Sequence, residues 1–260
     1  KRYTLQILLT LMLTRSKFAP LSSIAQLIER MVPQKGEVVS LKPVYLDDAM
    51  IATPSIAMSL AVKEIVRMGE VAQKNVRLGM DCLLEYDEEK LKYVLEHEPV
   101  VDSLEHDITH YLTKLSTSNE MSPDLAFKQA GLLHACTDLE RIGDHGQTLA
   151  KKGRKIMEED VQFSDDAKLE LKQLSELVLQ ASAMALEALE KDDKALAEEA
   201  VQMCRNVKAY QKEMRKNHVI RLNEGRCNAV NGFFMMELLI NMKRVSDHSK
   251  NIAQLVQGTF

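Results

Sequence analysis

One stretch of the sequence returns further along the chain with its charges and its apolar positions in the same order. The first copy is DLERIGDHGQTLA, residues 138–150, and the second is NMKRVSDHSKNIA, residues 241–253. Four residues recur 103 positions later, namely Arg141, Asp144, His145 and Ala150, which return as Arg244, Asp247, His248 and Ala253. This period is too long for one unit of a solenoid. The repetition therefore predicts two copies of a whole small bundle.

The composition favours helices along the whole chain. Hydrophobic residues make up 45% of the 260 residues, with only 10 Gly, 6 Pro and no Trp. A β protein of this length needs more turn residues and more β-branched or aromatic side chains. Long antiparallel helices that are joined by short loops pack as up-and-down bundles. We therefore predict an all-α fold of tandem three-helix bundles, with six long helices preceded by short juxtamembrane helices.

The expected divisions of the chain follow from caps, prolines and polar breaks. Residues 34–54 lack a helical period and predict an extended linker. Thr53 and Pro54 then open the first long helix as a cap followed by proline at the first helical position. The two helical repeats are expected over residues 55–157 and 165–257. The six helices are expected at about residues 54–84, 87–114, 122–157, 164–190, 194–222 and 228–256.

The first 33 residues contain two apolar segments. Residues 5–13, LQILLTLML, are too few to cross a bilayer, which takes about 20 residues. Residues 22–33, SSIAQLIERMVP, place their apolar side chains on one helical face. Residues 1–33 are therefore interpreted as the end of a membrane or juxtamembrane segment, with two helices packed on the bundle as the alternative.

Carboxylates gather on the second and third predicted helices. Glu98, Asp102 and Glu105 form one acidic stripe on the second, and Glu140 and Asp144 lie together beside the apolar stripe of the third. The neighbouring carboxylates of such a stripe repel one another. Hard cations such as Mg²⁺, Ca²⁺, Mn²⁺ or iron are the usual way to neutralise such a cluster. The sequence predicts a metal site in the first repeat, and a solvated acidic face is the alternative.

The histidines of the repeated stretch give additional candidate ligands. His145, Asp247 and His248 are the residues concerned, and the histidines could equally bond a neighbouring helix. A ferritin-like di-iron site needs E-x-x-H on two helices. None of the seven histidines has a glutamate three residues before it. That class of metal protein is excluded.

The second repeat replaces acidic residues by basic ones. Lys243 stands where the first repeat has Glu140, so the argument for metal weakens there. Five cations on one side of the fifth helix form a basic surface, which Arg221 is expected to extend: Arg205, Lys208, Lys212, Arg215 and Lys216. This surface is interpreted as a solvated face or as a contact for anionic lipid headgroups or an acidic partner.

Several classes of function are not expected. A net charge of −4 and a pI near 6.0 give no general attraction to nucleic acid. No nucleophile with a nearby base and no glycine-rich phosphate loop can be identified, so an enzyme is not predicted. The four cysteines are far apart and include no C-x-x-C pair, which favours reduced thiols that face the cytosol.

Four stretches of sequence resemble a known family. LERIGDH, residues 139–145, resembles the signature of PhoU domains, in which E-x-x-x-D lies on the third helix of each three-helix repeat. The segments LDDAMIATPSIAMSLAVKEIVRM (46–68) and KNHVIRLNEG (216–225) look more like the cytoplasmic tail of bacterial sodium–phosphate cotransporters than like the free-standing regulator. The first 33 residues, which end in LIERMVP, are similar to the last membrane segment of those transporters.

The resemblance implies a function and a site. It implies a regulatory module on the cytoplasmic side of the inner membrane, whose partner is the phosphate transport domain of the same polypeptide. The alternative is a free-standing regulator that acts in trans on a transporter or a sensor kinase. Family members bind multinuclear metal, such as an iron cluster, through E-x-x-x-D, which matches Glu140 and Asp144. Anionic lipid and a second copy of the chain remain further candidate partners.

Overall fold

The computed structural model describes residues 40–118 and 121–259. A short 3-10 helix, η1 (Asp48–Ala52), precedes six long helices. These are α3 (Pro54–Leu84), α4 (Glu88–Ser118), α5 (Pro123–Glu158), α6 (Asp165–Lys191), α7 (Lys194–Asn223) and α8 (Ala229–Gln257). Every regular element within the described ranges is helical, which confirms the all-α prediction. The two short helices expected in residues 1–33 lie outside the described residues.

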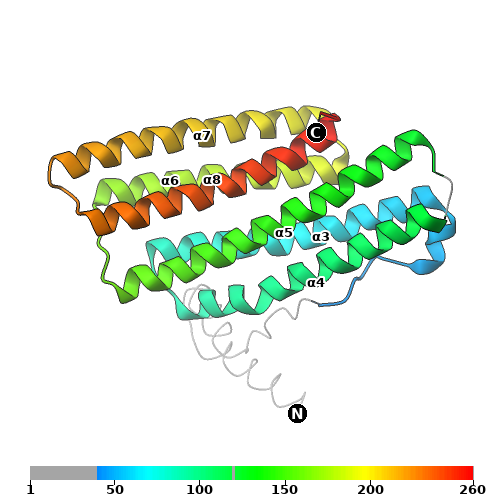
Figure 1. The fold of residues 1–260 in the computed structure, drawn as a ribbon, viewed down its shortest axis with the longest axis horizontal. Helices are drawn as coiled ribbons and strands as arrows, with labels where there is room; N and C mark the ends of the chain where they lie inside the picture. Colours follow the sequence, from blue (N-terminus) through cyan, green and yellow to red (C-terminus); the bar gives the residue numbers. More distant parts are fainter. Residues whose placement is uncertain (1–39, 119–120, 260) are drawn as a thin grey trace, which may run out of the picture. The chain divides into compact units, whose positions relative to one another are not determined.

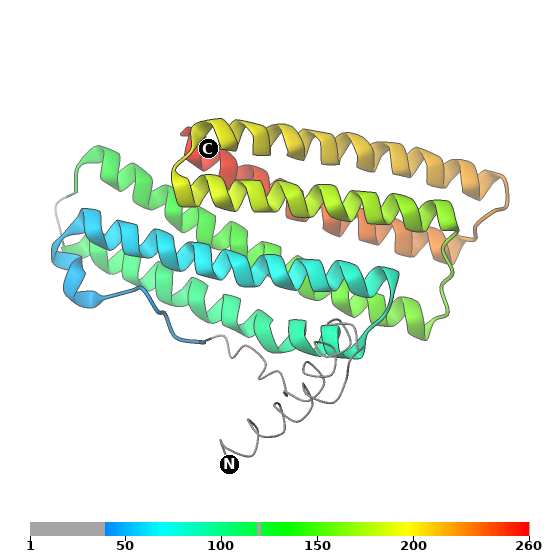
Figure 2. The same ribbon diagram turned by 180° about the vertical axis from the view of Figure 1, so that it is seen from behind.

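The six helices form two groups of three, and the described residues from Ser40 to Thr259 belong to one compact unit. Helices α3, α4 and α5 pack together as repeat 1, and α6, α7 and α8 as repeat 2 (Figure 1). The repeats meet through α3 and α5 of the first and α6 and α8 of the second. Helices α4 and α7 lie at the opposite edges of this unit, as both views show (Figures 1 and 2).

The buried positions of α6 and α8 repeat those of α3 and α5. Every buried residue of α6 follows a buried residue of α3 by 106 positions, and every buried residue of α8 follows one of α5 by 103 positions. The caps of α4 and α7 also correspond at an offset of 106 positions. Asp87 accepts a hydrogen bond from the N–H of Glu89, and Asp193 accepts one from the N–H of Ala195, both at 2.9 Å. The duplication therefore extends over all three helices of each repeat.

The helix starts follow the chemistry of capping. Ser122, Ser164 and Asn228 each accept a hydrogen bond from the backbone N–H three residues on, at 3.3, 3.3 and 2.8 Å. Thr53 precedes α3 without a side-chain cap bond, contrary to the expectation from the sequence. Pro54 opens that helix with a preset φ and no backbone N–H to satisfy.

Repeat 1 is held together by backbone contact between α3 and α5. A Cβ atom added at Gly79 would lie 2.4 Å from the carbonyl oxygen of Gly146. One added at Gly153 would lie 2.4 Å from the carbonyl oxygen of Cys82. Side chains at these positions would force the helices apart, because the contacting atoms belong to the backbone.

The chain before α3 is fastened to repeat 1. Residues 40–48 are here called the strap. Residues 40–47 have no regular structure, but the extended linker predicted over residues 34–54 is interrupted by η1, which begins at Asp48. The strap ends against α4, where the hydroxyl of Tyr111 donates to the carbonyl oxygen of Asp47 at 3.0 Å. Lys114 then forms an ion pair with Asp48 at 2.6 Å. Across residues 40–118 and 121–259, no helix has the length and apolarity needed to cross a membrane.

Candidate carboxylate site

Three of the five predicted carboxylates meet between α4 and α5. Glu98 and Asp102 lie one turn apart on α4, and the charges of Asp102 and of Asp144 on α5 both act on the Glu98 carboxyl group. The Gln147 amide of α5 donates to Glu98 Oε2 at 2.8 Å. The spacing read from the sequence therefore does bring these carboxylates together across two helices.

Glu105 and Glu140 complete the cluster at its edge. Glu140 stands one turn before Asp144 on α5, where the charges of Asp144, Asp102 and Glu105 act on it. Glu105 Oε1 accepts a hydrogen bond from the Thr109 hydroxyl at 3.3 Å. Both side chains are half-buried. Glu105 and Glu140 thus lie at the edge of the group formed by Glu98, Asp102 and Asp144.

Arg141 is the counter-charge of the cluster. Its guanidinium donates to Asp144 Oδ2 at 2.8 Å and lies 3.3 Å from Glu140 Oε2. The long side chain turns back along the helix surface to reach carboxylates at i−1 and i+3. Arg141 and Lys151, whose charge also acts on Glu98, together leave most of the negative charge of the five carboxylates uncompensated.

The mutual repulsion is visible in the pKa values. Burial, together with the charges of Asp102 and Asp144, raises the pKa of Glu98 to about 6. Burial first, and then the Asp144 charge, also raises the pKa of both Asp102 and Glu140. The cluster is therefore poised to accept a proton or a cation.

We expect the stability of the fold to depend on Glu98 between about pH 4.5 and 6. Its pKa is raised in the fold, so its contribution to stability is present below pH 4.5 and is lost as the pH rises through about 6. Solvent screening limits the loss to about 1 kcal/mol. Urea unfolding across this range should show a smaller loss for Glu98→Gln than for the wild type. Equal slopes in both proteins would contradict this assignment.

The donor set fits a hard cation. The site offers carboxylate oxygens, which are the ligands that divalent Mg²⁺, Mn²⁺ and Ca²⁺ prefer. In the described part of the chain, no three His, Cys, Asp or Glu side chains are already arranged around a common point as a metal shell. Asp144 is instead engaged by Arg141. A cation at this site would have to displace that guanidinium and draw the carboxylates inward.

Repeat 2 has a different arrangement at the matching positions. Lys243, the counterpart of Glu140, forms an ion pair with Asp247. The counterpart of Glu98, 106 positions on, is the buried thiol of Cys204. Asp247 therefore has a permanent cation as its partner and lacks the second carboxylate stripe. The donor chemistry for a metal lies in repeat 1.

The two repeated histidines join the repeats. His145 Nδ1 lies 3.0 Å from Asn241 Oδ1, and His248 Nδ1 lies 2.7 Å from Asp138 Oδ1. These two contacts are related by the 103-residue offset, so the repeated stretches bind each other across the α5–α8 interface. Burial lowers the pKa of His145. Each histidine thus bonds a neighbouring helix, as in the alternative to a metal-ligand role.

The predicted basic surface is present on α7, with one exception. All five of its cations are exposed. Arg221, which was expected to extend this surface, is only 4% exposed and binds Glu170 Oε2 at 2.8 Å. Its position in the apolar stripe of α7 turns it inward, where it needs a buried counter-ion. The basic surface therefore ends at Lys216.

One buried acidic residue outside the carboxylate cluster, Glu64, was not identified from the sequence. Glu64 is fully buried on α3 and lies 2.5 Å from the Arg67 guanidinium. Its position carried a signal, because it lies in helical register with the apolar Ala57, Ala61 and Met68. A glutamate within an apolar stripe indicates a buried, paired carboxylate.

The PhoU domain model matches residues 65–152 and 171–256, which are the cores of the two repeats. The chain belongs to the PhoU family. A Xylella fastidiosa (strain 9a5c) protein named phosphate-specific transport system accessory protein PhoU homolog is 25% identical over 195 residues, or 75% of this chain and 81% of the relative. A Thermotoga maritima protein, named phosphate-specific transport system accessory protein PhoU homolog 1, is 24% identical over 200 residues. The match covers 76% of this chain and 85% of that relative.

Crystal structures of two PhoU proteins share the fold. PhoU from Pseudomonas aeruginosa superposes with a TM-score of 0.71 at 22% identity, covering 75% of this chain and 93% of that one. The phosphate transport system regulatory protein PhoU from Streptococcus pneumoniae superposes with a TM-score of 0.69 at 20% identity. The match covers 78% of this chain and 95% of that one. These likenesses confirm the architecture of two PhoU repeats.

Proposed function

We propose that this PhoU chain regulates phosphate transport by acting in trans on a transporter or a sensor kinase. The observation that carries the proposal is the PhoU match over both repeats, together with the names of the relatives. Those relatives are accessory proteins of a phosphate-specific transport system. A regulatory role, rather than an enzymatic one, fits a bundle whose charged groups form no nucleophile–base pair that the sequence could identify.

The expectation of a transport domain in the same polypeptide receives no support from these relatives. The names of the relatives describe accessory proteins of a transport system and not transporters. The free-standing alternative therefore becomes the main proposal. Its site of action is the cytoplasmic side of the membrane, and the basic surface of α7 is available there to anionic headgroups or an acidic partner.

Loss of the chain from its own cell should change the uptake of inorganic phosphate by about twofold or more in phosphate-replete medium. The physical reason is that a regulator restrains or activates its transporter only while it is bound. Uptake of radiolabelled phosphate is measured with the gene present, removed, and returned on a plasmid. Identical uptake in all three strains would remove the proposal.

We further propose that the carboxylates of repeat 1 bind a divalent metal ion or an iron cluster. Glu98, Asp102, Glu105, Glu140 and Asp144 would supply its oxygen ligands, and the bound charge would relieve their repulsion. Protein purified without chelator should contain metal by elemental analysis. A Glu140→Ala, Asp144→Ala variant should lose it, whereas Asp247→Ala should retain it. Negligible metal in all three proteins would exclude the site.

A further inference from the structure

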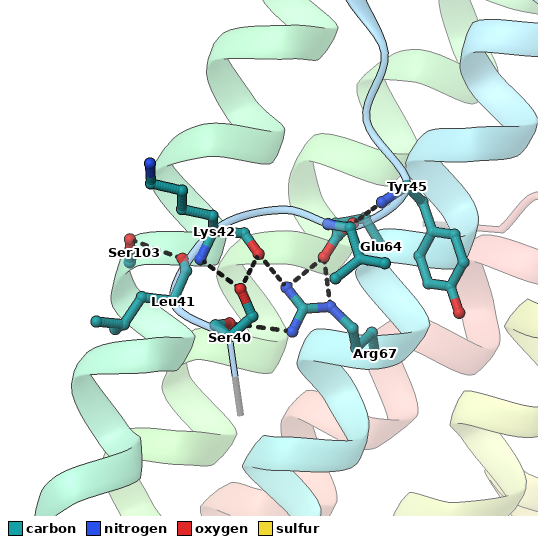
Figure 3. A network of polar contacts seen from close by, with 8 residues as sticks. Ser40, Leu41, Lys42, Tyr45, Glu64, Arg67 and Ser103 are labelled. Atoms are coloured by element: carbon teal, nitrogen blue, oxygen red, sulfur yellow. Dashed lines mark hydrogen bonds and ion pairs between the residues drawn. The ribbon is translucent and has the colours of Figure 1, made fainter. Parts of the chain in front are cut away.

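The strap shows how repeat 1 binds an extended piece of chain. Glu64 Oε2 accepts hydrogen bonds from the backbone N–H groups of Val44 at 2.8 Å and Tyr45 at 2.6 Å (Figure 3). Arg67 donates to the carbonyl oxygens of Ser40 and Lys42, each at 3.2 Å (Figure 3). A buried carboxylate thus recognises the main chain of the strap, with no requirement on side-chain identity.

Repeat 2 has a groove at the matching place. The 106-residue offset pairs the strap-contacting residues of repeat 1 with residues of repeat 2 as follows: Glu64 with Glu170, Tyr111 with Asn217, and Lys114 with Ile220. All three repeat 2 residues line one groove of about 340 Å³, together with Asp166, Leu169, Arg221 and Arg226. The chain enters α6 from α5, so no strap precedes this repeat.

The groove is built to hold polar backbone and apolar side chains. Glu170 is half-buried, and its two oxygens accept one hydrogen bond each, from Asn217 at 2.7 Å and from Arg221 at 2.8 Å. Each oxygen keeps a second lone pair for a further donor. Leu169 and Ile220 flank this carboxylate with side chains that are 57% and 50% exposed. Exposed apolar side chains around a polar groove mark a contact surface.

We propose that this groove, defined by Leu169, Glu170, Asn217 and Ile220, binds an extended peptide segment of a partner protein. The occupant is identified by the strap, which lies on the equivalent residues of repeat 1. Its backbone N–H groups complement the Glu170 carboxylate. An anionic lipid is disfavoured because both arginines of the groove already pair with carboxylates, Arg221 with Glu170 and Arg226 with Asp166 and Glu224. The proposal goes beyond the regulation of phosphate transport and does not depend on the carboxylate site.

The differences between the two grooves specify the peptide. Lys114 of repeat 1 pairs with Asp48 at the end of the strap, but Ile220 replaces it in repeat 2. An acidic residue at that point would lose its counter-ion and face an apolar side chain. The preferred occupant therefore has an apolar residue where the strap has Asp48.

The test uses the full chain and a fluorescent peptide with the sequence of residues 40–48, SLKPVYLDD, followed by fluorescence anisotropy. We expect a Kd on the order of 10⁻⁴ M. A second peptide with Asp48→Leu should bind at least about threefold more tightly. The Leu169→Asp, Ile220→Asp chain should lose affinity at least about tenfold. Ile240→Asp is the matched control, because Ile240 is 54% exposed and does not line the groove.

Three results would overturn the proposal. The first is no binding of either peptide at millimolar concentration. The second is binding that survives Leu169→Asp, Ile220→Asp and weakens with Asp48→Leu, which would place the peptide on repeat 1. The third is a change from dimer to monomer on Ile220→Asp without peptide binding, which would assign the groove to a second copy of the chain. Circular dichroism spectra of the variants confirm that each remains folded.

Discussion

Gly79→Ala is expected to lower the free energy of unfolding by about 3 kcal/mol, because the added methyl group meets backbone and not a movable side chain. Its Cβ would lie 2.4 Å from the Gly146 carbonyl oxygen and 3.2 Å from the backbone nitrogen of Ala150. The α3–α5 contact would have to open along its length. Urea denaturation followed by circular dichroism measures the loss.

Gly143→Ala is the matched control for this prediction. The atoms nearest to its added Cβ belong to the Val101 side chain, the first at 3.3 Å, and this side chain can shift by a few tenths of an ångström. We expect this variant to cost less than about 1 kcal/mol. If the two substitutions destabilised the protein equally, the close approach of α3 and α5 backbones would not be what limits the packing of repeat 1.

Glu64→Ala is expected to destabilise the fold by about 3 kcal/mol and to release the strap. The substitution leaves the Arg67 guanidinium without its buried partner, and it removes the acceptor for the N–H groups of Val44 and Tyr45. Urea denaturation gives the first effect. Limited proteolysis within residues 40–47 gives the second, since a detached strap becomes a substrate for protease.

Glu70→Ala, at an exposed position of the same helix, is the control for this experiment. It should change the unfolding free energy by less than about 0.5 kcal/mol and leave the strap resistant. Normal stability and proteolytic resistance in Glu64→Ala would mean that other contacts hold the strap. Tyr111 and Lys114, which bind Asp47 and Asp48, would then be the residues to change.

The architecture could be predicted because it depends on short-range rules. Three helix starts are indicated by capping side chains, each of which accepts a hydrogen bond from the backbone N–H three residues on: Ser122, Ser164 and Asn228. The repeated stretches at residues 138–150 and 241–253 indicate the duplication directly. Such signals are local in sequence, so they can be identified without knowledge of the tertiary packing.

The site could be predicted only in part, because pairing across helices depends on packing. The spacing of Glu98 and Asp102 indicated one acidic stripe, and the stripe does meet Asp144. The spacing could not reveal that His145 bonds Asn241, since the crossing of α5 and α8 is a tertiary property. Nor could it give the rotamer that brings Arg141 to Asp144.

The most direct test of the account is phosphate uptake by cells whose only copy of this PhoU chain carries Asp102→Asn and Asp144→Asn. The proposal that regulation acts through the carboxylate cluster of repeat 1 predicts that these cells take up phosphate as cells that lack the chain do. Asp247→Asn, the matched change in repeat 2, should leave uptake at the wild-type rate. Wild-type uptake in the double variant, with altered uptake on loss of the chain, would contradict the role of the cluster.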